Sequence, residues 1–108
     1  MTTLLDLLPM TEPHVGRGAT PAQRAEAFHK ANPQVFVELR RLALTLVDRG
    51  HQRFAIATLF EQLRWETYLR TTDTEGFKLN NSHRAFYSRL LMDSDERLAN
   101  VFETRSTK

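Results

Sequence analysis

The sequence lacks cysteine, has few glycines and prolines, and contains no long hydrophobic run. Without cysteine, the chain of 108 residues has no disulfide, no thiolate zinc site and no thiol nucleophile. Only four glycines and four prolines interrupt it. A chain of this length supports one compact core, so we do not expect a two-domain enzyme.

An excess of charge of one sign is also missing. Fifteen Lys and Arg residues against thirteen Asp and Glu residues give a formal net charge of +2. The bulk charge is therefore a weak indication of nucleic acid binding. Twelve of the fifteen cations are Arg, which suits bidentate contacts to phosphates or bases but equally reflects the codon usage of a GC-rich genome.

Motifs of catalysis and metal binding are absent as well. The sequence contains no glycine-rich phosphate loop and no GxSxG, HExxH or DxDxDG motif. The histidines do not have the spacing of metal ligands; they are His14, His29, His51 and His83. We therefore expect no catalytic activity, no metal and no cofactor.

The first ten residues are rich in leucine but do not resemble a targeting signal. Asp6 interrupts the leucines, Pro9 ends them, and no Lys or Arg precedes them. We expect a cytoplasmic protein without membrane contact, in which residues 1–19 form a flexible arm and residues 20–105 form a single helical domain. The leucines are candidates for docking on this chain, on a second copy or on another protein.

Two helices are predicted in the first half of the domain. Thr20 and Gln23 have the spacing of a capping box, which predicts a helix that runs to about Ala31. Apolar residues recur at helical period over 33–49, and Gly50 supplies the expected stop.

A third helix is predicted over 54–70, and we expect it to form a helical hairpin with the second around Gly50. Its apolar residues fall on two opposite sides, and one face cannot bury both sets. We favour cover of the second set by the N-terminal arm or the last helix; the alternative is a surface that meets a partner. This second set comprises Phe54, Trp65, Tyr68 and Leu69.

The remaining sequence predicts a short extended segment or β-hairpin near 71–79 and then a helix over 81–92. Apolar residues over 98–102 predict a short terminal helix. The chain is thus expected to be mainly α, a compact bundle of four to five helices with a helix-turn-helix or winged-helix-like core.

The helix over 81–92 is the candidate for a nucleic acid contact, because the sequence from 76 to 92 contains three cations and no acid. A helical wheel places small residues on its outer side between two arginines, and His83 among the apolar residues of its inner side. Small residues allow close approach to a DNA major groove while the guanidinium groups reach phosphates or guanine edges. The predicted contacts are Lys78, Asn81, Arg84, Ser88 and Arg89. An ordinary solvated helix face is the alternative.

An ordered set of short motifs between residues 28 and 105 resembles a group of small phage and prophage proteins. The motifs are Phe28-His29-Lys30-Ala31-Asn32-Pro33, Leu63-Arg64-Trp65-Glu66, Phe77-Lys78-Leu79-Asn80-Asn81, Tyr87-Ser88-Arg89 and Phe102-Glu103-Thr104-Arg105. Where such proteins have a function, it is DNA binding of a winged-helix-like type. The resemblance therefore implies a phage origin and the cytoplasm of a bacterial host. The sequence departs from the pattern at Gln52-Arg53, where the group has a serine that would cap the next helix.

Two functions remain open. The first is a non-enzymatic DNA-binding protein of helix-turn-helix or winged-helix-like type that reads DNA with the helix over 81–92. The second is a small interaction module that binds a second copy of the chain, as a homodimer, or a host or phage protein. Its contacts would be the aromatic set at Trp65, Tyr68 and Leu69 together with the leucine-rich N-terminus.

Overall fold

The structure is a computed structural model that describes residues 10–70 and 79–102, and within these ranges it is mainly helical and has no strand. The elements are α1 (Pro21–Ala31), α2 (Pro33–Asp48), α3 (Ile56–Arg70), η2 (Asn81–His83), α4 (Arg84–Ser94) and η3 (Glu96–Leu98), where η denotes a 3-10 turn. The prediction of a mainly α fold is confirmed. The predicted hairpin near 71–79 lies almost wholly outside the described residues.

Local sequence signals set the ends of the first two helices. The Thr20 hydroxyl accepts a hydrogen bond from the Gln23 amide at 3.1 Å, and the Gln23 side chain accepts one from the Thr20 amide at 2.8 Å. This capping box starts α1 where the sequence predicted it. After α2, Gly50 has a φ of +96°, a left-handed conformation that glycine adopts at little cost.

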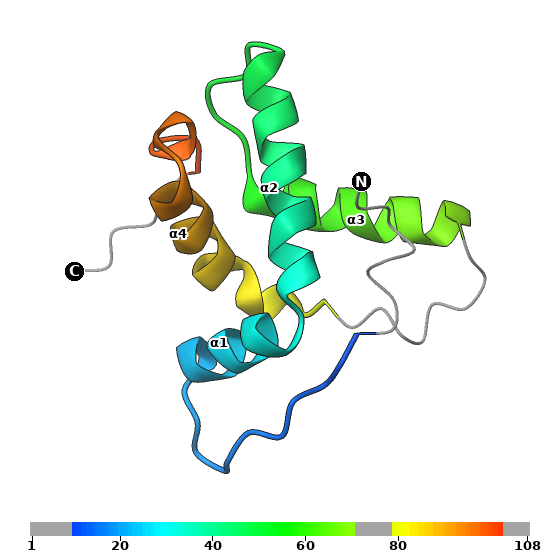
Figure 1. Ribbon diagram of the computed structural model, residues 1–108, viewed down its shortest axis with the longest axis vertical. Coiled ribbons are helices and arrows are strands. Elements are labelled where there is room, and N and C mark those ends of the chain that lie inside the picture. Colours follow the sequence, from blue (N-terminus) through cyan, green and yellow to red (C-terminus); the bar gives the residue numbers. More distant parts are fainter. Residues whose placement is uncertain (1–9, 71–78, 103–108) are drawn as a thin grey trace.

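The helices do not form the predicted hairpin. Figure 1 shows α3 running across α2 rather than back along it, with α4 beside α2 and α1 at its base. The connection between α2 and α3 is not a tight turn, because Phe54 contacts Val101 and Phe102. Its amide donates to the Val101 carbonyl at 3.0 Å, and its ring meets Phe102 edge-on at a centroid distance of 5.4 Å. Helix α3 therefore begins at Ile56, two residues later than predicted.

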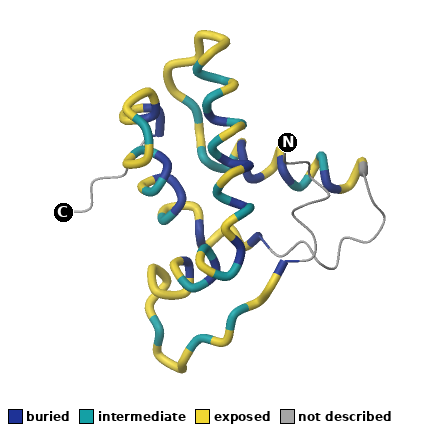
Figure 2. Tube along the Cα trace, viewed as in Figure 1, coloured by how far each residue is buried: buried dark blue, intermediate teal, exposed yellow. Residues whose placement is uncertain are grey.

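The core lies between the four helices and is closed by η3 and the residues that follow it. Figure 2 shows buried positions on the inward sides of all four helices. The largest fully buried apolar side chains are Phe28, Val35, Leu39, Leu59, Phe60, Leu63, Tyr87, Leu91 and Leu98. These residues join every helix to one apolar cluster, and burial of this cluster is the main stabilising contribution to the fold.

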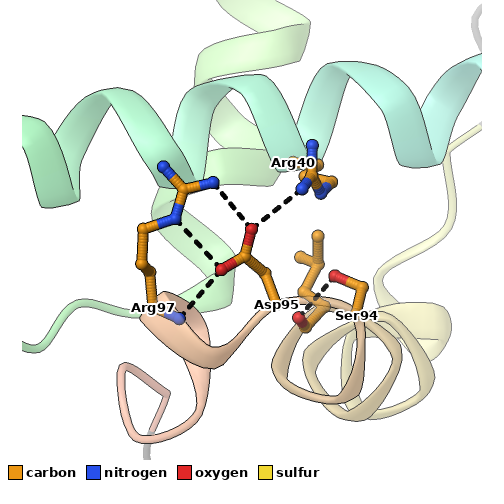
Figure 3. Close-up of polar contacts among 5 residues, drawn as sticks. Arg40, Ser94, Asp95 and Arg97 are labelled. Atoms are coloured by element: carbon orange, nitrogen blue, oxygen red, sulfur yellow. Dashed lines mark hydrogen bonds and ion pairs between the residues drawn. The ribbon is translucent and has the colours of Figure 1, made fainter.

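A charged cluster ties η3 to α2 (Figure 3). The Asp95 carboxylate caps η3 by accepting from the Arg97 amide at 2.9 Å, and it also accepts from Arg40 of α2 at 2.9 Å. Hydrogen bonds from the Arg97 side chain, with smaller contributions from its amide and from nearby positive charge, hold the pKa of the Asp95 carboxyl well below its usual range. The terminal helix predicted over 98–102 is wrong beyond Leu98, because the helical turn spans Glu96–Leu98 and residues 99–102 are not helical. Asp95 is the residue that ends α4 and starts η3.

Two residues of the segment before α1 are held against the domain. Met10 is buried in the core, and the Asn32 side chain exchanges two hydrogen bonds with the Thr11 backbone. The expectation of a flexible arm over 1–19 is therefore wrong for these two residues, because a buried amide and a buried thioether hold them. Residues 1–9 lie outside the described part of the chain.

Candidate binding surfaces

Three large apolar side chains are exposed together on α3. Trp65 and Tyr68 are each 60% exposed, and Leu69 is 68% exposed. Their spacing of three and four residues places them on one side of the helix, and we call them the α3 patch. Neither α4 nor residues 10–19 cover them, so the expected cover is not provided by these elements, and residues 1–9 of the arm lie outside the described part of the chain. Helix α4 packs instead against the opposite side of α3, where Leu59 and Leu63 are buried.

Phe54 does not belong to the α3 patch. It precedes the first turn of α3, is partly buried, and packs against Phe102. The prediction grouped it with Trp65 by assuming that the helix began at residue 54. Because residues 51–55 are not helical, the wheel that related the two side chains does not apply.

The α3 patch borders an open groove with acidic and amide side chains. Glu61, Gln62, Trp65 and Tyr68 are among the residues that line it. The Glu61 side chain is 70% exposed, and Gln62 donates a hydrogen bond to Glu66 at 2.6 Å. The described surroundings of the patch therefore combine aromatic rings with carboxylates.

Arg64 lies beside the α3 patch, and its guanidinium group is bonded to other residues of the chain. It donates to the Glu61 carboxylate, to the Leu79 carbonyl at 2.9 Å and to the Asn81 side-chain oxygen, and it lies over the Phe60 ring at 5.9 Å. It thereby fixes the chain that leads into η2. In the sequence Arg64 resembles the other surface arginines, because nothing local indicates a partner fifteen to seventeen residues away.

The predicted nucleic acid face on α4 is present only in part. Arg84 and Arg89 are exposed. Arg84 donates to the Asn81 backbone carbonyl at 3.1 Å, and among the described residues neither arginine forms an ion pair with a carboxylate. Asn81 is exposed, although Arg64 engages its side chain. Lys78 lies outside the described residues.

Ser88 was predicted on the outer side of this helix, and that placement is wrong. The residue is 6% exposed, because α4 packs on the side that carries Ser88 together with Tyr87 and Leu91. The exposed stripe instead runs from Ala85 through Arg89 to Asp93. A small residue at a helix contact lets the neighbouring helix approach closely, whereas the helical wheel grouped Ser88 with the small residues of the outer side. Ser88 is therefore not available for a base contact.

Within the described residues, no group of three or more His, Asp or Glu side chains could hold a metal ion. Helices long and apolar enough to cross a membrane are likewise not found in those ranges. The chain matches no protein-family model, and no curated protein and no solved structure is significantly similar to it.

Proposed function

We propose that this chain is a binding protein that inserts the α3 patch into an apolar groove of a partner protein. The observation that carries the proposal is the exposure of three large apolar side chains on one side of one helix. Contiguous exposed apolar surface of this kind is unfavourable in water and is characteristic of recognition surfaces. Trp and Tyr are also the residues that most often dominate the energy of an interface.

The spacing of the patch favours recognition as a helix. Anchors at positions i, i+3 and i+4 are typical of an amphipathic helix that lies in a groove, and Trp65, Tyr68 and Leu69 have this spacing. The carboxylates of Glu61 and Glu66 flank the anchors on α3. Glu61 pairs with Arg64 and Glu66 lies 4.0 Å from Arg41, so the patch offers a partner apolar contacts rather than free charge.

A second copy of the chain is a weaker candidate for the occupant. The exposed parts of the three side chains amount to roughly 400 Å² on the areas typical of such residues, whereas a stable interface buries about 800 Å² on each partner. A concave partner surface also encloses the groove residues beside the patch and buries more area than two convex helices do.

Trp65 is the only tryptophan in the chain, so its fluorescence reports on the patch directly. We expect the isolated protein to show the red-shifted emission and efficient iodide quenching of a water-exposed indole, at all protein concentrations that are measured. Partner binding should shift the emission to the blue. Emission that shifts to the blue with rising protein concentration alone would indicate self-association and contradict the choice of partner.

Replacement of Trp65 by alanine should weaken partner binding about 30-fold or more, the loss of a hot-spot residue. The measurement is titration calorimetry with a protein that is captured from nuclease-treated bacterial lysate by the wild-type chain and then purified. Val37→Ala is the matched control, because Val37 is 47% exposed on α2 and lies outside the patch. Equal dissociation constants for the two variants would refute the proposal.

DNA binding is a second candidate, supported by the two exposed arginines on α4 that form no ion pair with a described carboxylate. If this is the function, Arg84→Ala together with Arg89→Ala lowers the affinity for duplex DNA. The double variant also reduces the slope of log K against log salt by about 1.8, because each phosphate that an arginine neutralises contributes about 0.9. Gel retardation at several salt concentrations measures both quantities.

The control for this experiment is Arg24→Ala together with Arg49→Ala, which removes two exposed arginines from other elements. An equal effect of the two double variants would indicate unspecific charge attraction rather than a binding face on α4. Absence of retardation of any duplex at low salt would exclude the DNA function.

A further inference from the structure

Two of the four histidines lie within the domain and two lie on its surface. His83 in η2 is buried and His29 in α1 is half-buried, whereas His14 and His51 are exposed. The two inner histidines can therefore be compared with the two exposed histidines, which serve as controls. Neither inner histidine takes part in the binding surfaces described above.

The inner histidines hold α1 against its neighbours through ring contacts. The His83 ring lies 5.1 Å from the Phe28 ring of α1. The His29 ring lies 5.6 Å from Phe36 of α2 and 5.9 Å from both Phe86 and Tyr87 of α4. Each histidine therefore packs as an aromatic side chain at a contact between α1 and another element.

Both rings are suited to the neutral state. The Nδ1 atoms of His29 and His83 are buried without a hydrogen-bond partner among the described residues, and so is the Tyr87 hydroxyl beside His29. Protonation of such a nitrogen creates a charged N–H group without an acceptor, which is costly in a poorly solvated site. The neutral ring avoids this cost because an imidazole needs only one of its nitrogens to donate.

The carboxylates near the two histidines favour the protonated ring, but their influence is smaller than that of burial. Glu26 on α1 faces His29, and Glu12 from the segment before α1 faces His83. The contacts from α2 and α4 are uncharged rings, and burial raises the pKa of the Tyr87 hydroxyl further above neutrality. Burial has the larger effect, so the pKa of each inner histidine lies below its ordinary value of 6.5.

We propose that α1 is an acid-sensitive latch: protonation of His29 and His83 releases α1 from α2, η2 and α4, while the rest of the core stays folded. The stabilisation by the neutral rings is fully present above the unfolded pKa of about 6.5 and is lost as the pH falls below it. The clamp between Arg40 and Asp95 at the other end of the domain keeps its charges in mild acid, because the pKa of the Asp95 carboxyl lies far below this range.

The test is amide hydrogen exchange of the full chain between pH 7.5 and pH 5, corrected for intrinsic exchange, together with an NMR titration of the four imidazoles. We expect the equilibrium constant for opening of α1 to rise at least tenfold over this range, while amides of α2 and α3 change less. Each histidine contributes at most a factor of ten per pH unit. His29 and His83 should titrate below 6.5.

The variant with His29→Phe and His83→Phe retains the ring packing and cannot be protonated, so its α1 protection should not change with pH. The variant with His14→Gln and His51→Gln should behave like the wild type. A wild-type pKa at or above 6.5 for both inner histidines overturns the proposal even if the phenylalanine variant does not fold. An equal loss of protection in all helices also overturns it, because release would then not be local.

Discussion

Replacement of Leu63 by alanine is expected to lower the free energy of unfolding by about 2–5 kcal/mol. Leu63 has no exposed surface and lies in the central apolar cluster on the inward side of α3. The shorter side chain loses the transfer free energy of the removed carbons and leaves a cavity that the packed helices close only in part. A domain of this size has a total stability of about 5–15 kcal/mol, so this single change removes a large share of it.

The matched control is the same substitution on the other side of the same helix. Leu69→Ala changes the helix propensity of α3 in the same way, but Leu69 is 68% exposed, so its expected effect is below about 0.5 kcal/mol. Urea denaturation followed by circular dichroism measures both variants. Similar losses of stability would mean that the α3 patch is covered in solution, which would also contradict the proposed function.

Replacement of Asn32 by alanine is expected to lower the free energy of unfolding by about 2–4 kcal/mol, the sum of several buried hydrogen bonds. The buried Asn32 side chain accepts a hydrogen bond from the Thr11 amide at 2.7 Å, and donates to the Thr11 carbonyl at 2.8 Å and to the Phe28 carbonyl at 3.0 Å. Each such bond contributes about 0.5–1.5 kcal/mol, and a buried partner left unpaired costs more. We also expect the Thr11 amide to lose its protection from hydrogen exchange, because the segment before α1 loses its attachment.

Asn100→Ala provides the comparison, since Asn100 is exposed and the substitution should change stability by less than about 0.5 kcal/mol. The measurements are urea denaturation for the free energy and NMR-detected exchange for the Thr11 amide. Retention of Thr11 protection in the Asn32 variant would show that Met10 alone holds the segment, and it would contradict the assigned role of the amide.

Signals that act over a few residues were readable in the sequence. The capping box at Thr20 and Gln23 and the stop at Gly50 depend on backbone geometry within one turn, and both were predicted correctly. The helical content was predicted from apolar residues at helical period. This pattern places the apolar residues on one face of a helix, and that face is buried regardless of which element packs against it.

The candidate sites were predicted less well, because exposure depends on what packs against a helix. Trp65, Tyr68 and Leu69 were identified as a second apolar set, but the sequence did not show that they stay uncovered. Ser88 was assigned to the solvent side by a helical wheel, and the side on which α4 packs proved to include it. Phe54 was misplaced because the start of α3 depends on a contact with Val101, 47 residues along the chain.

By itself, the sequence determined that this chain is a small, mainly helical protein without cysteine chemistry, and where its first two helices begin and end. These properties depend on composition and on interactions between near neighbours, which the order of residues fixes directly. The tertiary structure decided that α3 crosses α2, that Asn32 anchors the segment before α1, and that the α3 patch faces solvent while two histidines lie inside. Those outcomes depend on contacts between segments far apart in the chain, and only the packing of all four helices selects among them.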